Sequence, residues 1–314
     1  MKNPALKNCR SATPKILVVG SIAFDTIKTP FGEKKKILGG AATYFSYAAS
    51  LFAPVHLLGV VGSDFPRQQI RKFEKRGIDT SGLQVRPGKT FRWSGGYEKN
   101  LKEARTISVS LNVMDGYSPT LPKHYRKSQH VFLANTDPEI QLKTLKQVDS
   151  PKLVVCDTMN LWIKTRLPEL KELLEKVDVL LLNDEEARLL TGRENLIAAC
   201  RDILRLGPKI AIIKKGEHGV ILASGKKDFF FTPAFPTTRV ADPTGAGDSF
   251  GGGFTGYITA TNDFSAANMR KALIYGAVVA SFTVEDFGIR ALEKINISDV
   301  ERRVSQIKKM IQIV

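Results

Sequence analysis

The chain has 314 residues, of which 43 % are hydrophobic and 25 % are charged, and this ordinary composition excludes a disordered or fibrous protein. Forty-seven Lys and Arg against 31 Asp and Glu give a net charge of +16. Because the basic residues are dispersed along the chain, a solvated surface explains this excess better than a specific nucleic-acid site. Three cysteines without C-x-x-C spacing argue against a disulfide framework, and no apolar run is long enough to span a membrane. We expect a cytoplasmic protein that binds neither membranes nor a specific nucleic acid.

Strand and helix signals alternate along most of the chain. Helical stretches are expected at 41–52 and between Asp64 and Gly77, where Asp64 would cap the helix, Pro66 would lie just inside it and Gly77 would end it. This alternation predicts an α/β fold with a doubly wound, mostly parallel sheet flanked by helices on both faces. The aliphatic runs typical of buried parallel strands lie at 16–19, 55–61, 131–133, 153–155, 179–182 and 210–213.

Two segments, about 22–38 and about 90–112, interrupt this alternation. The first is built about a Pro30-Phe31-Gly32 turn, and the second contains RTISVSLN, which alternates between apolar and polar side chains. Together they predict a small antiparallel β lid with Phe91, Trp93 and Tyr97 on one face. A decorative hairpin is the alternative interpretation. We expect a polar N-terminal extension at 1–14 and one main domain at 15–314 that carries the lid.

The stretch DPTGAGDSFGGGF at 242–254 carries the strongest chemical signal. A helical pattern follows Gly247, although three consecutive glycines stand in its early turns, and each glycine costs a helix about 1 kcal/mol. Either the sheet or a ligand must therefore press closely against this helix. The amides of Gly245, Ala246 and Gly247 would lie at the helix N-terminus, where unpaired N–H groups form an anion site suited to phosphate.

Asp248 follows in the first helical turn, next to this anion site. A carboxylate there is suited to accept the proton of a hydroxyl that attacks phosphorus. The alternative is that Asp248 only complements the helix dipole and that Asp242 caps the turn. Neither the P-loop pattern nor the dinucleotide-binding fingerprint is present.

The stretch at 242–254 closely resembles the C-terminal signature of the ribokinase-like (PfkB) carbohydrate kinases. Similar segments are GSIAFD at 20–25, LGGAATYF at 38–45, LNDEEARLLTG at 182–192 and IKKGEHGV at 213–220. The resemblance implies a ribokinase-like kinase domain at 15–314, a β lid that often mediates homodimerisation, and ATP-dependent phosphorylation of an alcohol.

Matching by position, the resemblance implies that Asp248 is the catalytic base and that the amides of 245–247 form the anion hole. Asn183 and Glu186 match an N-x-x-E pair associated with Mg²⁺, its waters and phosphate. Such a metal site agrees with the preference of Mg²⁺ for few protein oxygens and many waters. Plain helix capping by the same two residues is the alternative.

Lys215, Gly216 and Gly219 match the nucleotide side of the site, although a tight hairpin also explains the two glycines. Thr244 and Asp242 match positions that hold a monovalent cation in some relatives, so K⁺ is an additional expectation. The cofactors implied are ATP and Mg²⁺.

The expected substrate side begins at Asp25, just after the first strand, because a carboxylate can accept hydrogen bonds from two neighbouring hydroxyls. Gly39 and Gly40 would let backbone amides approach the substrate. Tyr44 stands where the family usually has an asparagine. Two further candidates end another strand, Asp157 and Asn160.

We predict an ATP-dependent kinase that acts on a small sugar or polyol. The first alternative is a nucleoside kinase of the same fold, since Phe91, Trp93 and Tyr97 are able to stack on a base. The more distant alternative is a non-catalytic ligand sensor or nucleic-acid-associated protein that uses the positive charge.

Overall fold

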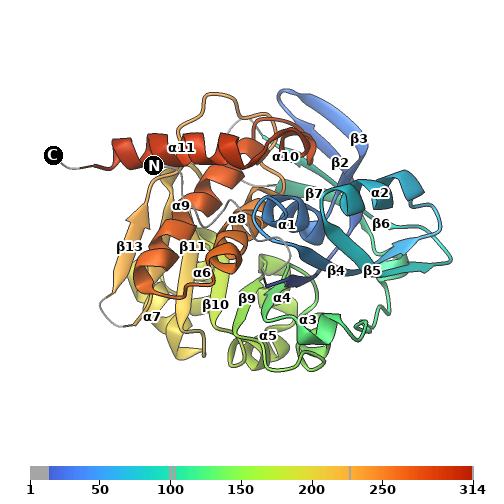
Figure 1. The fold of residues 1–314 in the computed structure, drawn as a ribbon, viewed down its shortest axis with the longest axis horizontal. Coiled ribbons are helices and arrows are strands. Elements are labelled where there is room, and N and C mark those ends of the chain that lie inside the picture. Colours follow the sequence, from blue (N-terminus) through green and yellow to red (C-terminus); the bar gives the residue numbers. More distant parts are fainter. Residues whose placement is uncertain (1–13, 99–100, 102–103, 226–227, 313–314) are drawn as a thin grey trace.

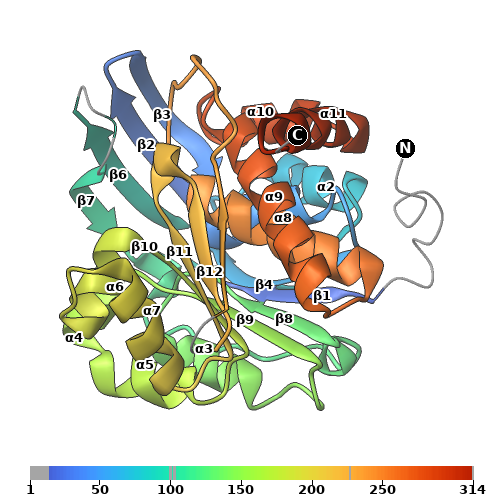
Figure 2. The same cartoon turned by 90° about the vertical axis from the view of Figure 1, so that its left-hand side faces the viewer.

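The computed structural model of the protein describes residues 14–98, 101, 104–225 and 228–312. Of the expected N-terminal extension at 1–14, all but Pro14 lies outside the described residues. The described chain forms one large sheet between two layers of helices, with a second, smaller sheet beside it (Figures 1 and 2). In the same part of the chain, no helix combines the length and the apolar character that crossing a bilayer requires.

The large sheet has nine strands among the described residues, in the order β13-β12-β11-β10-β9-β8-β1-β4-β5. All neighbouring strands from β5 to β11 run parallel, and β12 and β13 form an antiparallel edge. The predicted mostly parallel sheet is therefore confirmed. The strands are β1 (Ile16–Val19), β4 (Val55–Gly62), β5 (Ile78–Arg86), β8 (His130–Leu133), β9 (Leu153–Asp157), β10 (Val179–Asn183), β11 (Ile210–Lys214), β12 (Val220–Ala223) and β13 (Phe229–Thr232).

Helices cover both faces of this sheet (Figure 2). Alternate residues of β1 face opposite layers: Ile16 and Val18 belong to one core cluster, and Leu17 and Val19 to another. The first core packs against α1 (Ala41–Ala49), α2 (Arg67–Lys75), α8 (Ala246–Thr261), α9 (Ala266–Thr283), α10 (Arg290–Lys294) and α11 (Ile297–Met310). The second packs against α3 (Pro138–Leu145), α4 (Asn160–Thr165), α5 (Leu167–Leu174), α6 (Asp184–Thr191) and α7 (Leu196–Arg205).

The smaller sheet consists of the two segments predicted as a lid. Its strands are β2 (Ala23–Thr29), β3 (Gly32–Gly39), β6 (Phe91–Tyr97) and β7 (Ala104–Ser110), in the order β3-β2-β6-β7. Both hairpins are antiparallel as expected, whereas β2 and β6, which join them, run parallel. Every residue of β7 is exposed, so this edge strand is covered by nothing in the described chain.

Helix α2 begins later than the sequence predicts. Its N-cap is Pro66, whose side chain makes no capping bond. The carboxylate of Asp64 instead accepts hydrogen bonds from the backbone N–H and the hydroxyl of Thr90, both at 2.7 Å. The predicted capping role of Asp64 is therefore wrong, because a tertiary contact takes the side chain. The helix ends before Gly77, which has φ +78°, as predicted.

The three glycines of α8 lie where neighbouring elements approach the helix. A Cβ on Gly251 would come within 2.6 Å of the Phe132 ring of β8, and one on Gly252 within 2.6 Å of atoms of α1. On Gly253 a Cβ would lie 3.0 Å from the carbonyl oxygen of Tyr275 in α9. Close packing against the sheet and two helices thus explains these glycines without a ligand.

Candidate active site

Four charged side chains meet where the carboxyl ends of the central strands approach the N-termini of α6 and α8. Asp157 is the last residue of β9, Lys214 is the last residue of β11, Glu186 lies in the first turn of α6 and Asp248 in the first turn of α8. Ligands of open α/β sheets bind at this edge. The predicted residues Asp157, Glu186 and Asp248 are therefore brought together.

Lys214 is the residue that the sequence analysis missed. Its ammonium lies 2.9 Å from Oδ2 of Asp157, and the two side chains are only 15 % and 5 % exposed. Its Nζ also stands 3.0 Å from where a Cβ on Gly247 would be, so that glycine makes room for it. Its position directly after the strand expected at 210–213 could have identified Lys214 as a site residue, but the resemblance pointed to the neighbouring Lys215.

The ionisation of Asp248 is strongly affected by this cluster. Its pKa is raised to about 7, chiefly by burial; the charges of Asp157 and Glu186 contribute to the rise, and Lys214 opposes it. Burial likewise raises the pKa of Glu186 to about 7. A carboxyl group that titrates near neutral pH is suited to proton transfer.

Asn183 and Glu186 form a helix capping box. Oδ1 of Asn183 accepts the Glu186 N–H at 2.8 Å, and Oε2 of Glu186 accepts the Asn183 N–H at 2.7 Å. These two hydrogen bonds confirm that Asn183 and Glu186 cap the helix. The capping box uses one carboxylate oxygen of Glu186. The carboxylate still lies close enough to Lys214 and Asp157 for their charges to affect its pKa.

The glycine loop before Asp248 turns sharply into α8. Gly245 is the N-cap with φ +76°, and a Cβ there would fall 2.3 Å from the ring of Tyr44. The N–H of Ala246 donates to the carbonyl of Pro243 at 3.2 Å. The Ala246 amide is thus already partnered, and the face of Tyr44 packs directly on the loop.

The predicted substrate residues Asp25, Gly39 and Gly40 are adjacent. Asp25 is 3 % exposed, burial raises its pKa to about 7, and the backbone of Gly40 is hydrogen-bonded to its carboxylate. A Cβ on Gly39 would fall 1.8 Å from the Asp25 carboxylate. Gly39 therefore makes room for Asp25, whereas a Cβ on Gly40, which has φ +92°, would fall 2.5 Å from the carbonyl oxygen of Ser21. The approach of their amides to a substrate stays a prediction.

Tyr44 lies within electrostatic range of this group. Its side chain is 1 % exposed, and its hydroxyl is buried without a hydrogen-bond partner in the described part of the chain. Burial raises its pKa well above the usual value, and the charges of Asp25, Asp242 and Asp248 add to the shift. A buried hydroxyl with no partner is costly.

The lid reaches the glycine loop through Tyr97. The hydroxyl of Thr244 donates to the hydroxyl of Tyr97 at 3.1 Å, while the carboxylate of Asp242 accepts the backbone N–H groups of Thr244 at 2.9 Å and of Gly288 at 3.2 Å. Register pairs Trp93 of β6 with Asp25 of β2. One aromatic residue of the lid therefore contacts the candidate site, and a second is aligned with it.

The remaining candidates lie at its edges. Asn160 is exposed at the start of α4. Lys215, Gly216 and Gly219 occupy the turn between β11 and β12, where Gly216 has φ +56° and a Cβ on Gly219 would lie 2.1 Å from the carbonyl of Thr232. The tight connection between strands accounts for both glycines.

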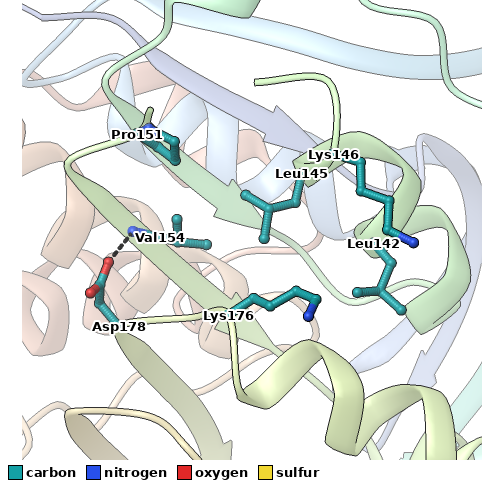
Figure 3. Close-up of a pocket in the computed structure, with 7 residues that line it drawn as sticks. All are labelled: Leu142, Leu145, Lys146, Pro151, Val154, Lys176 and Asp178. Carbon is teal, nitrogen blue, oxygen red and sulfur yellow. Dashed lines mark hydrogen bonds between the residues drawn. The ribbon is translucent and has the colours of Figure 1, made fainter. Parts of the chain in front are cut away.

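A surface pocket lies away from this site (Figure 3). The carboxylate of Asp178 accepts the N–H of Val154 at 2.9 Å, at the amino ends of β9 and β10 and therefore at the opposite edge of the sheet from Asp157. None of the predicted site residues lines it. Its lining is Leu142, Leu145, Lys146, Pro151, Val154, Lys176 and Asp178.

Comparisons with known proteins agree with this arrangement. The chain is 31 % identical over 244 residues to a cytidine kinase of Thermococcus kodakarensis, covering 76 % of this chain and 86 % of the relative. The crystal structure of a nucleoside kinase from Methanocaldococcus jannaschii superposes with a TM-score of 0.72 at 24 % identity, over 93 % and 98 % of the two chains. A ribokinase from Thermotoga maritima gives 0.73 at 21 % identity, over 93 % and 99 %. Residues 13–295 match the family model of the pfkB carbohydrate kinases. The chain therefore belongs to the pfkB family of carbohydrate kinases and has the ribokinase-like fold.

Proposed function

We propose that this kinase transfers the terminal phosphoryl group of ATP to a hydroxyl of a small sugar, polyol or nucleoside, with Asp248 as the general base. The observation that carries the proposal is the position of Asp248. It is in the first turn of α8, beside the glycine loop, and its pKa of about 7 allows it to accept and release a proton near neutral pH.

The groups around Asp248 supply complementary charge. The N-terminus of α8 and the ammonium of Lys214 both favour a negatively charged phosphoryl group. Because the Ala246 amide donates to Pro243, the anion hole in this proposal relies on the amides of Gly245 and Gly247 and on Lys214. Thr244, Lys215, Gly216 and Gly219 are assigned to the nucleotide side.

The acidic residues of the cluster fit Mg²⁺. Asp157 and Glu186 are buried carboxylates next to a single ammonium group, and burial raises the pKa of Glu186 to about 7, so a cation nearby would relieve the crowding of negative charge. In the proposal Glu186 acts through a water of the ion, with Asn183 beside it. When bound, the ion neutralises charge on the phosphates.

The substrate is held by Asp25 and Tyr44 in this proposal, with Gly39, Gly40, Asp157 and Asn160 around it. Asp25 accepts hydrogen bonds from two substrate hydroxyls, and the unpartnered hydroxyl of Tyr44 completes the site. A nucleoside is favoured by Trp93 and Tyr97 of the lid, whose rings could stack on a base, and by the cytidine kinase among the relatives.

The discriminating experiment measures ADP release with adenosine, cytidine, ribose, fructose and inositol as acceptors. Selective turnover of the nucleosides supports the nucleoside assignment, and selective turnover of the free sugars or inositol supports the sugar or polyol assignment. If no alcohol is phosphorylated and the protein binds DNA at physiological salt, the proposed reaction is refuted in favour of a nucleic-acid-associated role.

Further predictions belong to this proposal. If Asp242 helps to hold a monovalent cation, turnover should be faster in K⁺ than in Na⁺ or a bulky organic cation. A homodimer through the lid is supported by the exposed Ile107 and Val109 of β7, which are 66 % and 51 % exposed, and sedimentation tests it. The domain limits 1–14 and 15–314 and a cytoplasmic location also stay predictions.

A further inference from the structure

Three side chains with metal-binding donors meet far from the candidate active site. They are His56 of β4, Asp79 of β5 and His124, which precedes the 3₁₀ helix Tyr125–Lys127. One donor atom from each lies within 4.8 Å of the others. His56 and Asp79 are each the second residue of a parallel strand and face each other in register. The cluster is therefore at the amino edge of the sheet, opposite the edge that holds Asp248.

One ring nitrogen of His56 has no hydrogen-bond partner among the described residues. The residue is only 3 % exposed, and its Nδ1 lies 3.0 Å from the hydroxyl oxygen of Ser128. Its Nε2 is buried and has no hydrogen-bond partner among the residues that the structure describes. In the tautomer whose Nδ1–H donates to Ser128, Nε2 carries a free lone pair. Metal-binding histidines are held in the same way, with the second ring nitrogen donating to a neighbour.

Asp79 and His124 are positioned by their surroundings. Oδ1 of Asp79 accepts the N–H of Ser81 at 2.8 Å, which leaves Oδ2 facing Nε2 of His124 at 3.0 Å. The ring of Tyr125 stacks on His56 with 4.2 Å between centroids, and its hydroxyl donates to the backbone oxygen of Asp79 at 2.7 Å. These contacts fix the segment that carries His124 against β4 and β5.

The cluster is also open to solvent, because the side chains of His124 and Asp79 are partly exposed. The side chain of His124 is 50 % exposed, which gives an ion a path from solvent.

We propose that His56, Asp79 and His124 bind one Zn²⁺ ion, with water as the fourth ligand. Two imidazoles and a carboxylate are a zinc-type donor set. Tetrahedral bonds of about 2.0–2.1 Å place donor atoms about 3.3 Å apart, so donor atoms that lie within 4.8 Å of one another draw together by at most about 1.5 Å on binding. The ion joins β4, β5 and the segment at 121–128, and it stabilises the folded state because the unfolded chain lacks the site.

The test uses the full chain, stripped of metal by a chelator and kept in excess Mg²⁺, which occupies oxygen-rich sites but competes poorly for imidazoles. Zn²⁺ affinity is measured by competition with a chromogenic chelator, and Co²⁺ absorption reports the coordination geometry. The variants are His124→Gln and Asp79→Asn. His218→Gln is the matched control, since this surface histidine lies outside the cluster.

We expect one equivalent of Zn²⁺ in the wild-type chain, at least about 100-fold weaker binding in either variant, and no change in the control. Zn²⁺ should raise the melting temperature of the wild type but of neither variant. Equal kinase turnover of the Zn²⁺-free proteins in Mg²⁺ shows that the variants are folded. Absence of stoichiometric binding, or unchanged affinity in either variant, would mean that the three residues are only packed together, and it would overturn the proposal.

Discussion

Replacing Asp248 with asparagine separates the catalytic and the structural consequences of its environment. The substitution keeps the shape of the side chain but removes the group that titrates with a pKa of about 7. If Asp248 is the general base, turnover falls at least ~10²-fold while nucleotide binding is retained, because removing a general base typically costs 10²–10⁴-fold.

The pH dependence follows from the same pKa. A base with a pKa of about 7 is about one-eleventh ionised at pH 6 and about ten-elevenths at pH 8. The kcat/KM of the wild type should therefore rise about tenfold across this interval, since kcat/KM reports the free enzyme. In Asp248→Asn the residual kcat/KM should rise less steeply with pH, because one titrating group is gone.

As the pH rises, the free energy of unfolding of the wild type should fall while its kcat/KM rises. Because the folded-state pKa of Asp248 is raised from 3.8 to about 7, the folded protein binds this proton more tightly than the unfolded chain. The associated stabilisation is complete below pH 3.8 and is lost as the pH rises to about 7. A shift of about three units corresponds to an upper limit of about 4 kcal/mol, which partial solvent exposure reduces.

An asparagine has no such proton to lose. Asp248→Asn should therefore melt several degrees above the wild type at pH 8, and the difference should shrink toward pH 5. Calorimetry at the two pH values and steady-state ADP release supply the measurements. Wild-type turnover in the variant would refute the catalytic role. A melting difference that does not grow with pH would refute the argument about the pKa.

Three other substitutions test separate parts of the site. Lys214→Met removes the charge that lowers the pKa of Asp248, so the midpoint of the kcat/KM profile should move to higher pH. The same substitution leaves Asp157 buried without its partner, which should lower the free energy of unfolding by about 3–5 kcal/mol in a denaturant titration. An unmoved midpoint would contradict this coupling. Gly252→Ala places a Cβ within 2.6 Å of atoms of α1 and should cost about 1–3 kcal/mol in the same titration, so unchanged stability would refute the close packing. Tyr44→Phe removes a buried, unpartnered hydroxyl and should leave the free protein at least as stable, yet lower kcat/KM for the true substrate about tenfold through KM. An unchanged KM would remove Tyr44 from the substrate site.

Local patterns in the sequence were sufficient for the main architecture. Buried parallel strands are continuous aliphatic runs, so the six runs identified in the sequence correspond to β1, β4, β8, β9, β10 and β11. The strands β5, β12 and β13 were not predicted. In β5 buried and part-exposed residues are mixed, and such strands lack a clear period.

The residues of the glycine loop and Asp248 were also accessible from sequence. A phosphate site at a helix N-terminus needs glycines and an acid at fixed spacing in one continuous segment, so no distant contact is required to recognise it. Asp25 and Asp157 were predicted to lie near this segment through the rule that ligands bind at the carboxyl edge of a parallel sheet, and Glu186 through the resemblance of its N-x-x-E segment.

The amino-acid sequence by itself determined the α/β layering, the glycine loop at 242–248 and the acid in the first helical turn that follows it, because each depends on residues near one another in the chain. Only the tertiary structure decided that Lys214 pairs with Asp157, that Tyr44 packs on Gly245, and that His56 meets Asp79 and His124. Those contacts join segments that are far apart in sequence. Strand order and register bring these segments together, and no local pattern encodes either of them.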